Sequence, residues 1–394
     1  MRARFMPFLA LFLLAFPGAQ PSWSQAHPSA ENQSAKQPLL FVGTYTHKDA
    51  QGIYAWRFDS GTGRAEALGL VARTENPSFL ALHPSGRYLF AVNELGSFRD
   101  QRSGAVSAFG VDAATGHLTP INQVASGGAD PCFITVDAGG KNALVANYTG
   151  GSVEVLPIAA DGRLGEASAL LAFHGVGVNP ARQEAPHTHS VNLSPDGRHA
   201  LVADLGMDLI RSFRFDAQRG SLAPGEPPFA RSAPGAGPRH LAFHPNARRI
   251  YVLNELQSSV TTYEYTSKTG ALLEIQTVST LPAGFKGSNT GAEICVHPSS
   301  RFAYASNRGH DSISVFSIDA RTGSLSLIQH IPSGGRTPRS IALDPGGKWL
   351  LAAHQDTENI AVFRIDPASG RLAIAEGQGF KAPTPVCLVF RPEP

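Results

Sequence analysis

Cysteine is scarce in this chain, because only Cys132, Cys295 and Cys387 occur among 394 residues. Three thiols form at most one disulfide, and none of them has the spacing of a zinc or redox motif. Each lies among apolar neighbours in a strand-like segment. We therefore expect all three to be buried parts of the core.

Several functional signatures are missing as well. The net charge is only +2, so no global field attracts nucleic acid. The chain contains neither a glycine-rich phosphate loop nor a Gly-x-Ser-x-Gly elbow, which argues against nucleotide cofactors and a serine hydrolase. We expect no cofactor and no nucleic-acid partner. With 42% hydrophobic residues the chain is nevertheless apolar enough to fold around a large core.

The longest apolar run lies at the N-terminus, at Phe5–Phe16, after Arg2 and Arg4. It is too short to anchor a chain in a bilayer, and Ser24 and Ala26 supply the small residues of a cleavage site. We predict a signal peptide over residues 1–26, a polar spacer over 27–37 and one domain over 38–394. The mature protein is expected to be an exported monomer, periplasmic or secreted, that is not attached to a membrane.

An internal repeat organises the rest of the chain. Its core segment reads Pro-x-x-apolar-x-apolar-His/Asp-Pro, and copies start 47 to 57 residues apart. Seven copies begin at Pro77, Pro131, Thr188, Pro238, Gly291, Pro338 and Pro385. Repeats of this length are typical of solenoids and propellers.

Each copy continues as further strands separated by turn residues. A Gly-rich turn leads to an apolar strand such as Tyr88–Val92, then an alternating strand such as Ser312–Ile318, then an Asp-x-x-x-Gly turn before a fourth strand. Four strands per repeat form a propeller blade. The seventh copy has one strand only, and residues 39–45, 52–58 and 59–63 supply the start of its missing strands. We predict an all-β, seven-bladed propeller whose last blade is closed by both termini.

Two positions of the repeat carry charged side chains in some copies and small or apolar side chains in others. The position after the first residue of each copy carries Ser78, Cys132, His189, Arg239, Ala292, Arg339 and Val386. The position after the second strand carries Glu94, Tyr148, Leu205, Glu255, Arg308 and Gln355, with Thr44 in the closing blade. The first two strands of a blade are antiparallel, so both positions are expected at the same end of the ring, near its axis.

The polar members of these positions therefore predict one concave site. They are His189, Arg239, Arg339, Glu94, Glu255, Arg308 and Gln355. Three arginines against two glutamates favour an anionic ligand. Ion pairs that only join neighbouring blades are the alternative.

A long connection, residues 175–187, precedes His189 and is expected to enter the same site, although a simple insertion remains the alternative. His187 and His189 are too few for a metal site without a third ligand, and we predict no metal. His187 and His240 are included as substrate-binding residues. The histidines at 83, 244 and 297 share one turn position and are interpreted as structural.

Three motifs give the chain a family resemblance. The segments Gly237–Pro245, Tyr251–Leu256 and His189–Asp196 resemble the propeller lactonases, which include bacterial 6-phosphogluconolactonases and fungal 3-carboxy-cis,cis-muconate lactonizing enzymes. The resemblance covers residues 39–392. It implies a catalytic set of one His, two Arg and one Glu, which fall by motif on His189, Arg239, Arg308 and Glu255.

The sequence thus predicts a metal-independent lactonase that opens a sugar or related lactone. Either His189 or Glu255 would be the general base, and a glutamate beside arginines is the weaker base. Arg239 and Arg308 would bind the anionic group and the oxyanion. The alternatives are a muconate-type cycloisomerase and an exported propeller that binds without catalysis.

Overall fold

The structure, a computed structural model, describes Met1 and residues 37–391. The predicted signal peptide (1–26) and spacer (27–37) lie outside the described residues, apart from Met1 and Gln37. Among the described residues, no helix has the length and apolar character needed to cross a membrane.

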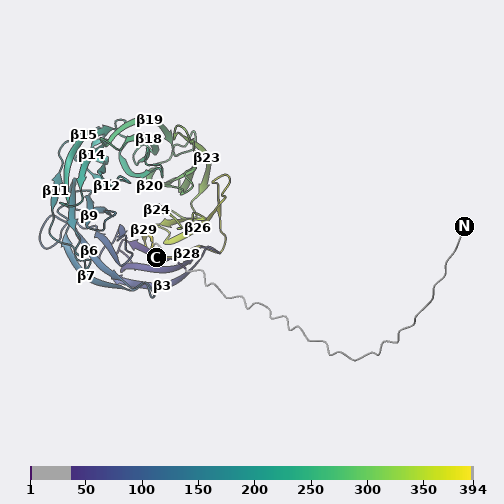
Figure 1. Cartoon of the computed structure of the whole chain (residues 1–394), viewed down its shortest axis with the longest axis horizontal. Helices are drawn as coiled ribbons and strands as arrows, with labels where there is room; N and C mark the ends of the chain where they lie inside the picture. The colour runs from purple at the N-terminus through teal and green to yellow at the C-terminus, as the bar shows by residue number, and fades with distance from the viewer. Residues whose placement is uncertain (2–36, 392–394) are drawn as a thin grey trace, which may run out of the picture. The chain divides into compact units, whose positions relative to one another are not determined.

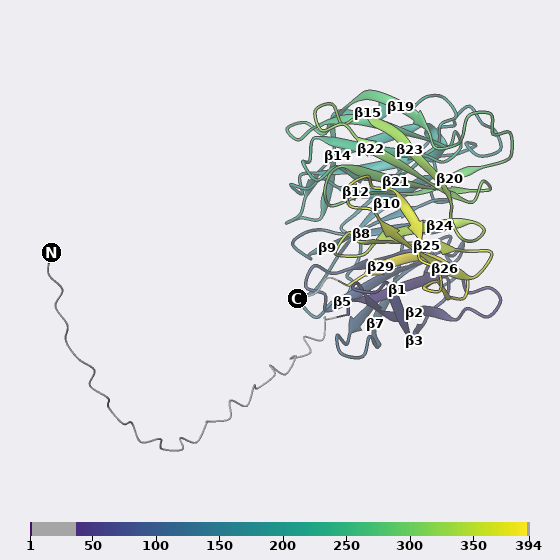
Figure 2. The same ribbon diagram turned by 90° about the vertical axis from the view of Figure 1, so that its right-hand side faces the viewer.

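The predicted seven-bladed propeller is confirmed. Seven antiparallel sheets are arranged around a central axis, with inner strands such as β12, β20 and β24 near the centre and β3, β7, β15, β19 and β23 at the rim (Figure 1). In the view turned by 90°, β15 and β19 lie at the top of the propeller, and β3 and β7 lie at the bottom (Figure 2).

The strands fall into four sets by their place in a blade. The innermost strands are β4 (Leu80–Leu82), β8 (Pro131–Val136), β12 (Thr188–Leu193), β16 (Pro238–Phe243), β20 (Thr290–Val296), β24 (Pro338–Leu343) and β29 (Pro385–Phe390). The second strands are β5 (Tyr88–Asn93), β9 (Asn142–Asn147), β13 (His199–Asp204), β17 (Arg249–Asn254), β21 (Phe302–Arg308), β25 (Trp349–His354) and β1 (Leu39–Thr44).

The outer half of each blade holds the remaining strands. The third strands are β6 (Ala105–Val111), β10 (Ser152–Pro157), β14 (Leu209–Asp216), β18 (Ser259–Thr266), β22 (Ser312–Ile318), β26 (Asn359–Ile365) and β2 (Gly52–Asp59). The fourth strands are β7 (Leu118–Ala125), β11 (Ala169–Ala172), β15 (Ser221–Arg231), β19 (Ala271–Ser279), β23 (Leu325–Pro332), the pair β27 (Leu372–Ile374) and β28 (Phe380–Lys381), and β3 (Arg64–Arg73). A short 3-10 turn, η1 (Leu205–Met207), follows β13. We number the blades one to seven from β4 to β29.

The seventh blade joins the two ends of the propeller. Its strand order is β29-β1-β2-β3, and β29 pairs with β1 through Phe41 opposite Val389 and Val42 opposite Leu388. This pairing closes the ring and completes the seventh blade with four strands, as the repeat count predicts.

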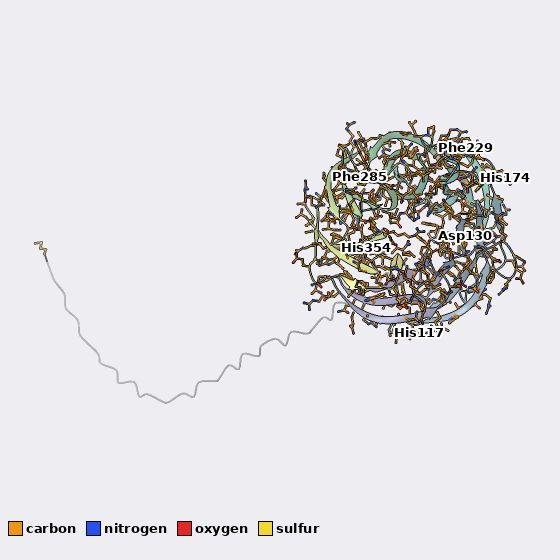
Figure 3. All side chains as sticks on the ribbon, turned by 180° about the vertical axis from the view of Figure 1, so that it is seen from behind. His117, Asp130, His174, Phe229, Phe285 and His354 are labelled. Carbon is orange, nitrogen blue, oxygen red and sulfur yellow. The ribbon has the colours of Figure 1, made fainter. Side chains whose placement is uncertain are left out.

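The core lies between neighbouring blades because alternate residues of a strand face opposite sides. In blade seven, Leu40 and Val42 pack against Leu351 and Val362 of blade six, while Phe41 packs toward blade one. Burying a large apolar side chain of this kind stabilises the fold by about 1.5–3 kcal/mol. Side chains fill the spaces between the blades, and the labelled His117 and Phe229 lie at the outer rim (Figure 3).

The Asp-x-x-x-Gly turns are built as their sequence predicts. Oδ1 of Asp319 accepts hydrogen bonds from the backbone N–H groups of Arg321 and Thr322, and the N–H of Gly323 bonds to the Asp319 carbonyl at 2.8 Å. Gly323 has a φ of 78°, a value that favours glycine.

Candidate active site

A repeated β-bulge sets the direction of the side chains at the start of the inner strands. In blades two, three, four and six the ladder skips one residue, which is Cys132, His189, Arg239 and Arg339 in turn. A bulged residue is left out of the pairing, and its side chain is turned away from the regular alternation. The variable position found in the sequence is therefore the bulge.

The second variable position follows the last paired residue of the second strand. Asn254, for example, pairs with Pro238, and Glu255 comes next; in blade seven Thr44 pairs with Pro385. The residue equivalent to Glu255 in the closing blade is therefore Tyr45. The prediction of Thr44 was wrong by one residue, because the repeat spacing cannot be counted across the chain termini.

The two positions meet in one cavity of about 420 Å³ at the mouth of the ring. Five of the predicted site residues line this cavity, together with five residues that were not predicted as site residues. The first group is His189, Glu255, Arg308, Arg339 and Glu94, and the second is Tyr45, Cys132, Tyr148, Arg182 and Thr290.

Glu255 is the centre of a buried ion-pair cluster. Its Oε2 lies 3.0 Å from Nε of Arg239 and 2.9 Å from Nη2 of Arg308, and its Oε1 accepts a 2.7 Å hydrogen bond from Arg182. Burial alone would raise the pKa of this carboxyl, but the arginines, Arg308 foremost, lower it to about 2. Glu255 is thus a permanent anion that holds three guanidinium groups in place.

His189 is almost fully buried beside this cluster. Its Nε2 lies 3.8 Å from Oε2 of Glu255, and its Nδ1 lies 3.7 Å from Sγ of Cys132. Burial lowers the pKa of His189 well below 6.5, and the positive charge of Arg239 lowers it further. The imidazole is therefore neutral at pH 7. Burial also raises the pKa of Cys132, which keeps its thiol protonated.

Arg182 comes from the long connection before β12. Its side chain is 39% exposed, and its guanidinium donates hydrogen bonds to Glu255 and, at 3.2 Å, to the Tyr148 hydroxyl. The neighbouring Gln183 is fully buried and donates to the Leu205 carbonyl and to Asp208, both at 2.8 Å. The predicted entry of this connection into the site is therefore correct. Arg182 is the longest side chain of this connection, and that feature of the sequence could have identified it as a site residue.

The opposite wall is made by Glu94, Tyr45 and Arg339. The Tyr45 hydroxyl donates to both carboxylate oxygens of Glu94 at 2.9 and 3.0 Å, and Nη2 of Arg339 donates to the Tyr45 oxygen at 2.7 Å. The guanidinium of Arg339 also lies 5.2 Å from the centre of the Tyr45 ring. Three guanidinium groups and two carboxylates line the cavity, and Arg239 contacts Glu255 from behind it, so the site is basic as predicted.

Four predicted residues do not line the cavity. Arg239 lies behind it, where it contacts Glu255 and donates to the Ala292 carbonyl. His240 lies one residue further along the inner strand, bonded at 2.7 Å to Glu293, with its ring edge-on to His189. Gln355 is half-buried and is not in the lining.

His187, the fourth, supports the wall instead. Its ring stacks on Tyr148 with centroids 4.4 Å apart, and its Nδ1 faces the Tyr148 carbonyl at 3.1 Å. Its Nε2 lies 3.1 Å from Glu184. Among residues 37–391, no three His, Cys, Asp or Glu side chains are grouped so that they could hold a metal ion.

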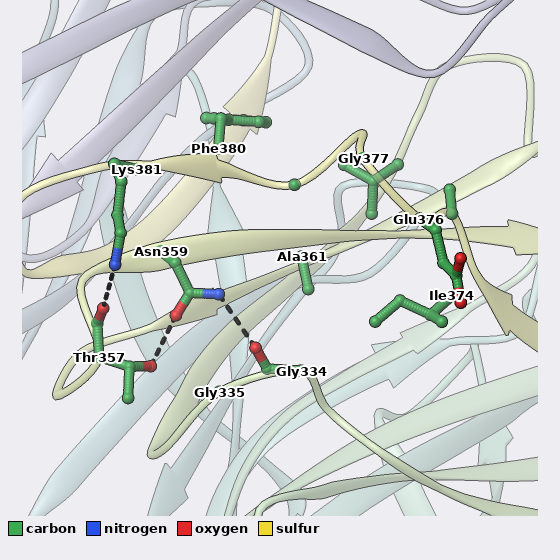
Figure 4. Close-up of a pocket in the computed structure, with 13 residues that line it drawn as sticks. Gly334, Gly335, Thr357, Asn359, Ala361, Ile374, Glu376, Gly377, Phe380 and Lys381 are labelled. Atoms are coloured by element: carbon green, nitrogen blue, oxygen red, sulfur yellow. Dashed lines mark hydrogen bonds between the residues drawn. The ribbon is translucent and has the colours of Figure 1, made fainter.

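A second cavity, of about 500 Å³, opens at the rim of blade six (Figure 4). It forms because β27 and β28 pair with opposite ends of β26 and leave a hollow beside Ala361. Lys381 donates to the Thr357 carbonyl, and Asn359 donates to the Gly334 carbonyl at 3.1 Å. This cavity has no cluster of buried charges, so the mouth of the ring is the better candidate for catalysis.

Comparisons with known proteins identify the family to which this fold belongs. Residues 39–390 match the family model described as lactonase, seven-bladed β-propeller. A 6-phosphogluconolactonase of Bacillus subtilis is 35% identical over 299 residues, 76% of this chain and 82% of the relative. A second, from Formosa agariphila, is 35% identical over 76% of this chain and 84% of its own. The structure of a periplasmic gluconolactonase of Pseudomonas aeruginosa has 34% identity and a TM-score of 0.85, covering 91% of this chain and 99% of that one.

Proposed function

The chain belongs to the lactonase family of seven-bladed β-propellers and is a lactone hydrolase, and we propose that it opens a sugar lactone in the cavity around Glu255. The observation that carries this proposal is the buried cluster in which Glu255 fixes Arg182, Arg239 and Arg308. Such fixed positive groups stabilise negative charge that develops on a carbonyl oxygen, at no cost of reorganisation during the reaction.

His189 is the proposed general base. A water molecule attacks the lactone carbonyl carbon while the neutral imidazole accepts its proton, and a tetrahedral oxyanion forms. The bond between the carbonyl carbon and the ring oxygen then breaks, and the imidazolium returns the proton to the departing alkoxide. Glu255 lies 3.8 Å from Nε2 and stabilises the imidazolium between these steps. Glu255 itself, with a pKa of about 2, is too weak a base for this role.

The arginines hold the oxyanion in this proposal. Arg308 and Arg182 both line the cavity and would stabilise the negative charge of the oxyanion. Arg239 lies behind the cavity wall and contributes by its contact with Glu255. Lactone hydrolysis needs a base, an oxyanion stabiliser and a proton donor for the leaving group, and this arrangement supplies all three.

The substrate is proposed to be an unphosphorylated sugar lactone. Relatives with 34–35% sequence identity are named as 6-phosphogluconolactonases and as a periplasmic gluconolactonase, so both phosphorylated and unphosphorylated sugar lactones are candidate substrates. The sequence features of residues 1–26 support export, and phosphorylated sugars are intermediates of the cytoplasm. An exported enzyme would meet the unphosphorylated compound.

Export is tested by expressing the full chain and determining the N-terminus of the protein outside the cytoplasm. The proposal expects a mature protein that begins at His27. A full-length protein that stays in the cytoplasm would contradict export, and it would move the substrate proposal toward 6-phosphogluconolactone.

The activity is tested by proton release at constant pH from the mature protein. Glucono-δ-lactone, 6-phosphogluconolactone and a muconolactone are compared after subtraction of spontaneous opening. The proposal expects the highest kcat/KM for glucono-δ-lactone. A preference for either of the other two compounds would replace the proposed substrate.

A further inference from the structure

The two carboxylates of the cavity have opposite surroundings. Glu255 is engaged by three guanidinium groups, whereas Glu94 accepts from one neutral hydroxyl, that of Tyr45. Among the described residues, no Lys, Arg or His nitrogen comes within ion-pair distance of Glu94. The cation on this side, Arg339, reaches it only through the Tyr45 oxygen.

Glu94 is held in place despite having so few partners. Its backbone N–H donates to the Asn76 carbonyl at 3.0 Å, and its own carbonyl accepts from the Asn76 side chain at 3.3 Å. Burial raises the pKa of Tyr45, so its hydroxyl stays protonated and remains a donor to the carboxylate. Arg339 fixes this hydroxyl by donating to its oxygen. The carboxylate is therefore preorganised at the cavity wall.

Within residues 37–391, hydrogen bonds use little of the accepting capacity of the Glu94 carboxylate. A carboxylate offers roughly four acceptor positions, and the single proton of Tyr45, shared between the two oxygens, occupies few of them. Glu94 lines the cavity, so the remaining positions are available to a ligand there. Two adjacent ring hydroxyls of a sugar match a carboxylate by donating one hydrogen bond to each oxygen.

We propose that Glu94, positioned by Tyr45 and Arg339, is the specificity-determining residue that binds adjacent ring hydroxyls of the lactone. The inference rests on the proposed function, and it narrows the substrate class to polyhydroxylated lactones. A lactone without hydroxyls displaces water from Glu94 and leaves its remaining acceptor positions without donors, which costs affinity. A lactone that bears a carboxylate at this wall is repelled by it.

The test compares substrates and variants in one cycle. The kcat/KM values of the mature wild type and of Glu94→Ala are measured for glucono-δ-lactone and for analogues that each lack one ring hydroxyl. For at least one analogue the wild type is expected to lose about 10- to 100-fold, as for a lost hydrogen bond to a charged group. Glu94→Ala is expected to lose a similar factor on glucono-δ-lactone and to show no further loss on that analogue.

The controls separate specificity from chemistry. Glu94→Gln keeps the size and one acceptor of the side chain and should fall between the wild type and Glu94→Ala. Glu376→Gln, at the rim of blade six, should behave as wild type. If Glu94→Ala lowered kcat equally for every lactone, Glu94 would act in the chemical step and the inference would be overturned. Equal activity of wild type and Glu94→Ala on all lactones would overturn it as well.

A binding measurement distinguishes this inference from the proposed function. Anhydroglucitol, a hydroxylated ring without a carbonyl, is titrated into both proteins by calorimetry. If the wild type binds anhydroglucitol at least tenfold more tightly than Glu94→Ala, the inference is supported even when no lactone is hydrolysed. The absence of hydrolysis would then contradict only the proposed function. Equal binding by the two proteins overturns the inference even if the wild type is an active lactonase.

Discussion

Arg182 donates a 2.7 Å hydrogen bond to Oε1 of Glu255, although its backbone lies in the connection between blades two and three and Glu255 follows β17 in blade four. The contact joins a half-exposed side chain to a buried one. It makes the connection part of the cavity wall.

Arg182→Ala should weaken catalysis more than stability. The Arg182 side chain is partly exposed, so its loss should lower the free energy of unfolding by only about 0–1 kcal/mol. The variant should lower kcat/KM on glucono-δ-lactone by at least tenfold, because one of the proposed oxyanion donors is gone. Urea titration and initial rates measure the two effects. Arg163→Ala, an exposed arginine away from the cavity, is the control and should change neither quantity.

Glu255→Gln should lower both the stability and the catalytic activity. Replacing the carboxylate leaves Arg239 and Arg308 buried without their counter-charge, which typically costs about 3–5 kcal/mol. Activity should fall by about a hundredfold or more, because the guanidinium groups lose their fixed positions. A folded variant with wild-type kcat would show that the cluster is structural only.

Stability should fall in two steps as the medium becomes more acidic. Burial depresses the pKa of His189 in the folded protein, so between the unfolded value of 6.5 and the folded value only the unfolded chain binds the proton, and acid favours unfolding. Glu255 is depressed from 4.5 to about 2, so its contribution is complete above 4.5 and is lost as the pH falls toward 2. Urea denaturation at pH 7.5, 6 and 5 measures the His189 window, and the same titration at pH 4, 3 and 2.5 measures the Glu255 window.

The matching variant isolates the first step. His189→Gln cannot take up the proton, so its unfolding free energy should fall less between pH 6.5 and 5 than that of the wild type. An identical slope in the two proteins would mean that other buried histidines, such as His240, account for the acid sensitivity.

Mixing the protein with cis,cis-muconate should leave the ultraviolet absorbance of the diene unchanged. A muconate carboxylate placed against Glu94 is repelled by it, because Arg339 reaches Glu94 only through the Tyr45 oxygen. Loss of the diene absorbance at an enzyme-dependent rate would favour the cycloisomerase alternative and would count against the role of Glu94.

The repeat made the fold predictable from sequence, because seven copies of one strand pattern define both the blades and the strand that is missing at the C-terminus. It also made much of the cavity predictable, since His189, Glu255, Arg308, Arg339 and Glu94 occupy two repeat positions that converge near the axis. These positions are informative because each blade repeats the same backbone geometry.

The rest depended on features that a repeat does not encode. Arg182 lies in an irregular connection whose path is set by the burial of Gln183. Tyr45 was missed, and Thr44 was predicted in its place, because the repeat spacing cannot be counted from the last copy to the N-terminal strands. His240 was expected to face the ligand, but it lies next to the bulged Arg239 and faces Glu293 and His189.

Whether His189 is the general base is tested by proton release from glucono-δ-lactone, measured for the wild type and for His189→Gln at constant pH and equal protein concentration. We predict release well above the spontaneous rate for the wild type and release at the spontaneous rate for His189→Gln, with both proteins folded by circular dichroism. Wild-type release that the substitution leaves within a factor of about three would contradict the assignment of His189 as the base.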